Sequence, residues 1–509
     1  MDELVQWFYA QGGGLDESSM GLTNFAGQGR GAVALRDLPE GHTLFTIPRE
    51  LTLSVRTSSL PARLGMESWK QFGLHIGWTG LILCMMWEES LGPSSRWSTY
   101  LPTLPSNFDT PMFWCEEDLR ELRGTAVVDK IGKDDAERDY HEKLVPAIKS
   151  RPDLFPEELI PQNYSMERYH IMGSRILSRT FHVDPWKPEN GEKGQQEERS
   201  EESDPDPHSM DVDVEPPAET HEPLIGQREE ENGDIDDDDD EEEEDDEDED
   251  GENPADVAMV PIADMLNARY GSENAKLFYE ERVLRMVTIK PIKSGEQIWN
   301  TYGDPPNCDL LRRYGHVDLV DLSQPLSGKG NPADVVEVRA DLVVASVSKT
   351  PASDLQDRVD WWLELTDDDT FVIMTDCELP EELASFVRLL FLANDEWEKA
   401  RKKGKLPKAK VDPSTLSIVA DVLERRLREY PTTIEEDEQL LVPERAGHLS
   451  TNKKHAAIVR LGEKRILDGT LRKVKDMMSV HGAQKGKDKK RGSDRHGDDA
   501  ERRVKKSRR

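Results

Sequence analysis

The 509-residue sequence predicts an α+β protein, in which a unit of short strands with a helical insertion is followed by an all-α domain. Short apolar segments bounded by glycine and proline occur on both sides of a long acidic stretch, which is typical of strands joined by tight turns. A mainly helical pattern, broken by prolines, covers residues 55–175. Beyond about residue 350, apolar residues recur at helical spacing.

The first elements follow from local patterns. Leu4, Trp7 and Phe8 have helical spacing and predict a short N-terminal helix. A glycine-rich turn over residues 27–31 leads into the first predicted strand, and Pro/Gly turns separate later ones. Strands are predicted over residues 32–35, 43–47, 259–262, 276–280, 283–289 and 297–301.

Helices are predicted where apolar residues repeat every three to four positions. Residues 74–87 form the most apolar stretch, which is shorter than the roughly 20 residues that cross a bilayer. We expect a buried helix there, with His75 as a core histidine rather than a metal ligand. Trp361 and Trp362 are expected in a hydrophobic core rather than on a base-stacking surface. Four further stripes predict C-terminal helices over residues 355–363, 383–390, 416–427 and 467–478.

Charge is distributed very unevenly. The chain has 66 Lys and Arg against 103 Asp and Glu, and 17 of the 19 residues over 234–252 are acidic. Residues 187–256 contain too few apolar side chains to offset the entropy of ordering, so a disordered loop is expected. The tail over 485–509 holds 12 basic and 5 acidic residues, and it is expected to be unfolded and to serve nuclear import or contact nucleic acid.

Several classes of protein are excluded by the sequence. The first residues lack the basic and apolar regions of a secretory signal. The four cysteines lie far apart without a C-x-x-C pair, so neither a zinc site nor a disulfide framework is indicated. We therefore expect an intracellular monomer with no membrane or metal partner, and with nucleic-acid contacts only through the basic tail.

Gly29 and Gly31 bracket Arg30 in a pattern that invites comparison with a dinucleotide-binding turn. Such a turn requires an apolar strand before the glycines and a helix after them, and neither is predicted here. Glycine lacks a Cβ, so backbone groups at these positions can approach a ligand closely. Arg30 could pair with a carboxylate of that ligand, or it could be a solvated surface arginine.

Four further motifs follow in order along the chain. They are Ser-Arg-Thr-Phe at 178–181, Ala-Asp-Met-Leu-Asn-Ala at 263–268, Trp-Asn-Thr-Tyr-Gly at 299–303, and Leu-Arg-Arg-Tyr-Gly-His at 311–316. Together with the glycine turn they resemble the SET-domain lysine methyltransferases. The match is to the branch that contains the Rubisco large-subunit methyltransferase and the fungal ribosomal lysine methyltransferases. Residues 430–437 and 460–467 resemble the substrate-binding domain of that branch.

The resemblance implies transfer of a methyl group from S-adenosylmethionine (AdoMet) to a lysine amine. Tyr302 would be the catalytic residue and would also contact the cofactor, because its phenol can accept weak hydrogen bonds from the polarised methyl group. Asn267 would hold the cofactor ammonium through its amide, and Ala268 would contribute main-chain contacts only. Many SET enzymes have histidine where this chain has Ala268.

The resemblance also assigns residues around the lysine channel. Arg179 would contact cofactor and substrate, or alternatively be a buried arginine that pairs with an acidic residue. Phe181 and Tyr314 would form walls of the channel, and Asp264 would meet the basic substrate. A plain packing role remains open for Phe181, Tyr314 and Asp264.

The sequence thus predicts a SET catalytic domain over residues 1–320, a helical substrate-binding domain over 321–480 and a disordered basic tail over 481–509. The expected substrate is a basic protein, with a large-subunit ribosomal protein implied by the resemblance. Alternatives are a histone or other nuclear protein as substrate, or a non-catalytic SET-fold binding module. The expected location is the nucleus, with the cytoplasm as the alternative.

Overall fold

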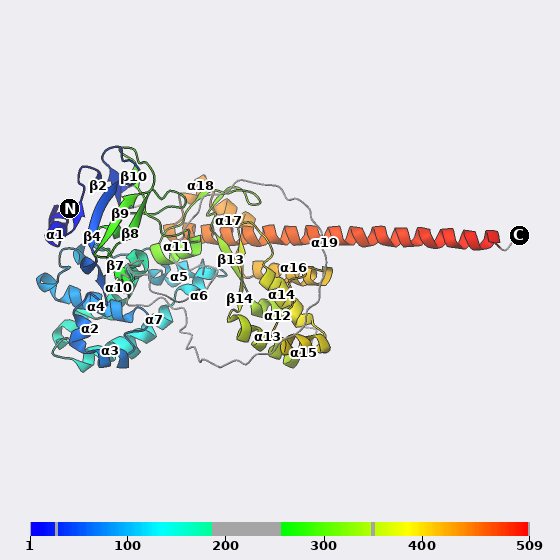
Figure 1. Ribbon diagram of the computed structural model, residues 1–509, viewed down its shortest axis with the longest axis horizontal. Coiled ribbons are helices and arrows are strands. Elements are labelled where there is room, and N and C mark those ends of the chain that lie inside the picture. The colour runs from blue at the N-terminus through cyan, green and yellow to red at the C-terminus, as the bar shows by residue number, and fades with distance from the viewer. Residues whose placement is uncertain (1, 26–28, 186–255, 348–351, 507–509) are drawn as a thin grey trace, which may run out of the picture.

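The computed structural model describes residues 2–25, 29–185, 256–347 and 352–506 (Figure 1). The acidic run over 234–252 lies outside the described residues, as does part of the glycine turn at 27–31. Three small antiparallel sheets form the N-terminal unit, and a helical region follows it.

The three sheets combine strands from both sides of the acidic stretch. The first has the order β1-β4-β9-β8, the second β10-β3-β2 and the third β5-β7-β6. The predicted assembly of one unit from both halves is therefore observed. The strands are β1 (Gly14–Leu15), β2 (Met20–Phe25), β3 (Gly29–Ala34), β4 (Thr43–Pro48), β5 (Leu53–Ser54), β6 (Thr180–His182), β7 (Val257–Met259), β8 (Ala275–Tyr279), β9 (Val283–Thr288) and β10 (Gln297–Ile298).

Two predicted strands end three residues earlier than expected, and both early ends shape the site described below. β7 ends at Met259, and β10 ends at Ile298. The extended backbone beyond each strand leaves its sheet, and the two segments meet in an isolated parallel bridge between Ala268 and Asn300. Alternating apolar residues predict extended backbone but not which neighbour it pairs with.

A helical insertion lies between β5 and β6. Helix α4 is buried almost all round, since every residue from Thr79 to Glu88 is buried. The predicted helix over 74–87 therefore begins five residues later than expected. Gly73 and Gly77 take positive φ angles and break the helix before it, so His75 is exposed in a turn and its prediction as a core histidine was wrong. The insertion contains α2 (Leu60–Leu64), α3 (Met66–Gln71), α4 (Thr79–Ser90), α5 (Glu116–Arg120), α6 (Ala126–Lys130), α7 (Lys133–Asp139), α8 (Val145–Ser150), α9 (Ile160–Asn163) and α10 (Met166–Arg179).

The C-terminal region has its own hydrophobic core, in which Trp361 and Trp362 are buried as predicted. It also contains the two-stranded sheet of β13 (Val335–Arg339) and β14 (Thr370–Met374), which the all-α prediction did not include. The four predicted apolar stripes lie on α13, α14, α16 and α19. The helices are α12 (Ala340–Val347), α13 (Ala352–Thr366), α14 (Glu381–Phe391), α15 (Asn394–Lys402), α16 (Pro413–Leu427), α17 (Ile434–Leu440), α18 (Pro443–Ala446) and α19 (Thr451–Lys506).

Helix α19 continues far beyond the globular part of the molecule (Figure 1). It reaches Lys506, so the tail predicted to be disordered is drawn as helix. Among the described helices, none combines the length and apolar character needed to span a membrane.

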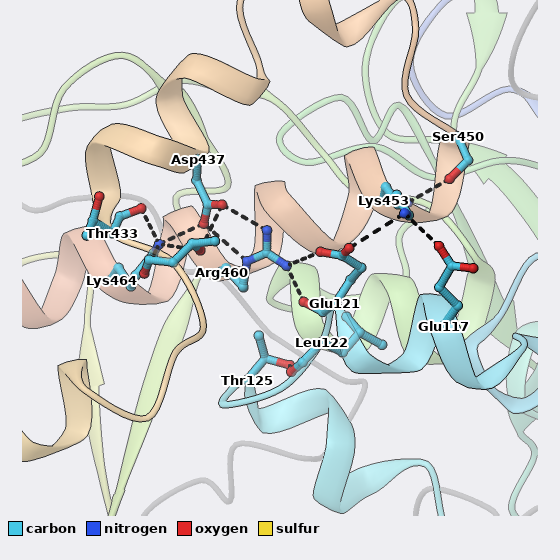
Figure 2. A network of polar contacts seen from close by, with 11 residues as sticks. Glu117, Glu121, Leu122, Thr125, Thr433, Asp437, Ser450, Lys453, Arg460 and Lys464 are labelled. Atoms are coloured by element: carbon cyan, nitrogen blue, oxygen red, sulfur yellow. Dashed lines mark hydrogen bonds and ion pairs between the residues drawn. The ribbon is translucent and has the colours of Figure 1, made fainter.

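The helical insertion and the C-terminal region are joined by a buried polar network (Figure 2). Arg460 of α19 donates to the carbonyl oxygen and the carboxylate of Glu121, just after α5. The same guanidinium binds Asp437 of α17, and Lys464 of α19 binds Asp437 as well. Because Arg460, Asp437 and Lys464 are almost completely buried, the network fixes the two regions relative to each other.

Candidate active site

The site lies where the segments that follow β7 and β10 cross. Asn300 donates its backbone N–H to the carbonyl oxygen of Asn267 at 2.9 Å, beside the bridge between Ala268 and Asn300. Two residues further on, the hydroxyl of Tyr302 donates to the carbonyl oxygen of Leu266 at 3.2 Å. The crossing therefore brings the predicted residues Asn267, Ala268 and Tyr302 together.

The backbone before this crossing is strained. Ile262 is buried and has φ 72° and ψ −46°, a conformation that a β-branched residue rarely adopts. It is followed by the single turn of Ala263–Met265, which lies against β3. Strain of this kind is retained where the surrounding structure requires one backbone path, commonly at functional sites.

Tyr302 and Tyr314 form a stacked pair. Tyr314 is the last residue of α11 (Asn307–Tyr314), which ends at Gly315 with φ 76°, and the ring centroids are 4.5 Å apart with an interplanar angle of 9°. Burial raises the pKa of Tyr302 to about 12, with Arg179 opposing the rise and Asp264 adding to it. Burial and then Tyr302 raise the pKa of Tyr314 above its usual range. Both phenols are therefore neutral near pH 7.

Arg179 is held by the main chain and side chain of one residue. Its Nη1 donates to the carbonyl oxygen of Asp264 at 2.5 Å and lies 3.8 Å from the Oδ2 atom. The same Oδ2 accepts a hydrogen bond of 2.9 Å from the hydroxyl of Tyr100. The Nε of Arg179 is buried and has no hydrogen-bond partner within the described residues. Arg179 thus pairs with an acidic residue and still has a donor available at the site.

The prediction that Asp264 meets the substrate is corrected by the structure. The Asp264 side chain is 0% exposed, because the turn at Ala263–Met265 directs it inward toward Tyr100. Burial raises its pKa to about 6, against the opposing effects of Arg179 and Tyr100. Asp264 therefore positions Arg179, and it is not on the surface that a protein substrate would reach. Tyr100 was not predicted, and no sequence motif marks it.

Gly31 faces two amide side chains with unused donors. A Cβ on Gly31 would lie 2.7 Å from Nδ2 of Asn267 and 2.9 Å from Nε2 of Gln297. Both nitrogens are buried without a hydrogen-bond partner in the described part of the chain. Arg30, on the same strand, is exposed, and its positive charge partly opposes the rise in the pKa of Asp264 that burial causes. Gly29 has φ 72°, which favours glycine.

This cradle fits the carboxylate end of an amino-acid-like cofactor such as AdoMet. Two buried N–H donors without acceptors call for an acceptor group. The unpaired Nδ2 of Asn267 suits the carboxylate, and its predicted contact with the cofactor ammonium stays a prediction. Gln297 was missed by the sequence analysis; it lies on β10 and pairs with Val33 of β3, two residues beyond Gly31.

A small cleft of about 10 Å³ opens beside Tyr302, and we call it the acidic cleft because two of its three charged lining residues are aspartates, the third being Arg269. Its walls include Ala268, Tyr270 and Tyr302, together with Asp304 and Asp318. Burial, followed by the charges of Glu273 and Asp318, raises the pKa of Asp304. These carboxylates, unlike that of Asp264, line a cavity. Asp304 directly follows the Asn-Thr-Tyr-Gly motif, a signal that could have identified it.

Phe181 is the predicted residue that the structure does not bring into the tyrosine pair. It lies on β6 opposite Ala258 of β7 and packs against the core of the N-terminal unit. Within the described residues, its ring makes no aromatic contact with Tyr302 or Tyr314. Its role as a channel wall stays a prediction.

Comparison with known proteins gives relatives for both parts of the chain. The family model for the Rubisco LSMT substrate-binding domain matches residues 351–467. Ribosomal lysine N-methyltransferase 4 of Saccharomyces cerevisiae is 29% identical over 326 residues, which is 64% of this chain and 54% of the relative. The N-lysine methyltransferase SETD6 of Homo sapiens is 28% identical over 466 residues, which is 86% of this chain and 83% of the relative.

Solved structures show the same fold over nearly the whole chain. The SET domain of LSMT bound to lysine and AdoHcy has a TM-score of 0.60 at 17% identity and covers 93% of this chain and 90% of its own. Rubisco LSMT bound to AdoMet has a TM-score of 0.59 at 17% identity, and the match covers 94% of this chain and 92% of that structure's chain. These structures confirm the predicted fold class, and the relatives named lysine methyltransferases confirm the family resemblance and the enzyme class. The AdoMet and AdoHcy bound in the solved structures agree with the predicted cofactor. The predicted domain boundaries and individual site residues stay predictions.

Proposed function

We propose that this chain, an AdoMet-dependent protein-lysine methyltransferase by its fold and its relatives, methylates a lysine of a basic protein, and that this protein belongs to the large ribosomal subunit. The name of the yeast relative supports a ribosomal substrate, whereas SETD6 is named only for its lysine methyltransferase activity. The acidic cleft beside Tyr302 supports a basic substrate, since Asp304 and Asp318 line it.

The hydrogen bond between Tyr302 and Leu266 carries the mechanistic part of the proposal. The hydroxyl proton of Tyr302 is directed at the carbonyl oxygen of Leu266, so the phenol oxygen presents only its lone pairs toward the cleft. An oxygen in that state accepts hydrogen bonds from the amine N–H groups and weak ones from a polarised methyl group. Tyr302 therefore orients the incoming amine without acting as a strong base.

AdoMet, when bound, supplies the methyl group, which leaves the sulfonium sulfur as the neutral amine nitrogen forms the new C–N bond. The chain's own residues bind and orient. Asn267 and Gln297 offer buried donors to the cofactor carboxylate, and Arg30 adds a positive charge nearby. The stacked rings of Tyr302 and Tyr314 exclude water, which favours the uncharged amine.

Two other functions remain as alternatives. A histone or other nuclear protein could be the substrate, because the C-terminal residues 502–509 are rich in Lys and Arg. That cluster also supports our proposal that the protein is located in the nucleus, with the cytoplasm as the alternative. A non-catalytic binding module for basic proteins would lack any methyl transfer, and the fixed lone pairs of Tyr302 favour the enzyme.

The substrate proposal is tested by presenting both classes of protein to the purified full-length chain. Large-subunit ribosomal proteins and core histones would each be incubated with isotope-labelled AdoMet and analysed by mass spectrometry for methylated lysine. We expect label on a ribosomal protein and little on histones. Preferential labelling of histones would replace the ribosomal assignment, and no labelling of either would support a binding module.

Replacing Gly31 by Ala is expected to weaken AdoMet binding by about tenfold. The new Cβ would crowd the two amide nitrogens at distances that real Cβ atoms essentially never show, and such overpacking costs about 1–3 kcal/mol. Isothermal titration calorimetry measures the effect. Gly447→Ala is the control, since its Cβ would meet no atom closer than 3.8 Å. Equal AdoMet affinity in the Gly31 variant and the wild type would show that Gly31 and the two amide groups do not bind the cofactor.

The Asn267–Ala268 pair predicts opposite outcomes for neighbouring substitutions. Asn267→Ala removes a buried donor, and we expect a roughly tenfold loss of AdoMet affinity, as for a charged hydrogen bond. Ala268→His should leave affinity within a few-fold, because Ala268 contributes only backbone. Calorimetry on both variants distinguishes the roles, and an Asn267 variant with unchanged affinity would contradict the assignment.

A further inference from the structure

A second, larger pocket lies beside the acidic cleft. It has a volume of about 390 Å³, within the range of roughly 300–1,000 Å³ that ligand pockets occupy. The segment over residues 319–334, Thr375, helix α17 with the turn that follows it, and the first part of α19 enclose it. Its apolar walls are Leu319, Leu322, Leu326, Leu441, Val442, Ile458 and Leu461.

The two cavities are separated by a single stretch of backbone. Asp318 lines the acidic cleft, and the next residue, Leu319, lines the larger pocket and is 39% exposed. Asn307 fixes this stretch: its amide accepts from the backbone N–H of Asp318 at 2.7 Å and donates to the Asp318 carbonyl at 3.1 Å. Its own backbone N–H donates to Asp334 at 2.7 Å, in the wall of the larger pocket. The continuous backbone from Asp318 to Leu319 therefore places the larger pocket next to the cleft.

The rim of the pocket is positively charged in a strongly acidic protein. Lys329 and Lys454 are exposed at the pocket and form no ion pair within the described residues. Arg465 adds a third cation, which Glu438 binds at 2.9 Å. The chain as a whole has a net charge of −37, so this local excess of cations favours an anionic group on the occupant.

We propose that this pocket holds a large apolar side chain of the protein substrate, a few residues from the methylated lysine, with an acidic substrate residue at the Lys329–Lys454 rim. The inference rests on the proposed methyltransferase function and specifies its substrate class. The pocket residues from Glu438 to Arg465 lie within the region matched by the substrate-binding family model. Contiguity with the cleft favours a peptide segment over a free small molecule.

A peptide library measures the preference directly. Fifteen-residue peptides carry a fixed central lysine, so that seven extended residues on either side reach about 23 Å. With labelled AdoMet, the wild-type protein should methylate most strongly the pools that have Leu, Ile or Phe at one fixed distance from the lysine. Among these pools, methylation should be strongest where Asp or Glu is next to the apolar residue. Tyr302→Phe is the negative control for the chemistry.

Two variants connect this preference to the pocket. Val442→Asp places a charge on the apolar wall, and Lys454→Glu replaces a positive charge at the rim with a negative one. For the best apolar peptide, we expect Val442→Asp to raise KM at least tenfold, with kcat and AdoMet affinity unchanged. Lys454→Glu should remove the preference for an acidic neighbour. Val372→Asp and Lys403→Glu are the controls, since both residues are exposed in the same region but away from the pocket.

Each outcome has a distinct meaning. Methylation of no pool by the wild type would overturn the proposed function and the inference with it. Methylation without an apolar preference would overturn the inference alone and leave the methyltransferase function standing. The apolar preference could persist in Val442→Asp, or Val372→Asp could reduce it to the same extent. Either result would show that a surface other than the pocket binds the apolar side chain of the substrate.

Discussion

Tyr302→Phe is expected to lower kcat by roughly 100-fold while leaving the fold and AdoMet affinity unchanged. The substitution removes only the hydroxyl, whose proton is held by the Leu266 carbonyl and whose lone pairs face the cleft. The stack with Tyr314 is retained, because phenylalanine keeps the ring. The rate is measured under single turnover with saturating AdoMet and substrate, so that the chemical step is observed.

Tyr140→Phe provides the matched control. Tyr140 is also partly buried and donates its hydroxyl to a backbone carbonyl, that of Tyr164, at 2.9 Å, but it lies in the helical insertion away from the cleft. It should retain nearly wild-type turnover. If Tyr302→Phe turns over as fast as Tyr140→Phe, the phenol oxygen has no catalytic role.

Asp437→Ala is expected to destabilise the protein by about 3–5 kcal/mol, because it leaves buried Lys464 without a carboxylate and buried Arg460 with that of Glu121 alone. Asp437 is 0% exposed, and it accepts from Arg460 at 2.8 Å and from Lys464 at 2.7 Å (Figure 2). Burial acts to raise its pKa, but the hydrogen bonds and charges of Arg460 and Lys464 lower it overall. Urea denaturation followed by circular dichroism gives the change in unfolding free energy.

The comparison pair for this experiment is on the surface. Asp395 and Lys399 form an i,i+4 ion pair in which both side chains are more than 70% exposed. Asp395→Ala should change the unfolding free energy by less than about 1 kcal/mol. A loss for Asp437→Ala no larger than this would mean that the buried network does not hold the insertion against α19.

The same network gives a pH dependence with a definite sign. Because the folded-state pKa of Asp437 is depressed, its contribution to stability is complete above the ordinary aspartate pKa. That contribution is lost as the pH falls through the depressed folded value. Stability that depends on Asp437 should therefore decline only in acid, and Asp437→Asn should flatten that part of the profile.

The sequence by itself determined the secondary structure wherever local periodicity was strong. The hairpin of β8 and β9 and the helices α13, α14 and α16 follow from alternation and from 3.6-residue spacing, which depend on neighbouring residues alone. Short motifs also marked Asn267 and Tyr302 as candidate cofactor-binding residues. Backbone pairing then brought them together across the crossing of two segments.

Only the tertiary structure decided the partners of buried polar groups. No local pattern predicts that Asp264 turns inward to Tyr100, that Gln297 faces Gly31, or that Arg460 reaches Glu121. These contacts join residues separated by 164, 266 and 339 positions, and each is chosen by the position of whole elements rather than by chain neighbours. Burial makes an unpaired polar group costly, so the fold selects such partners only after its layers are assembled.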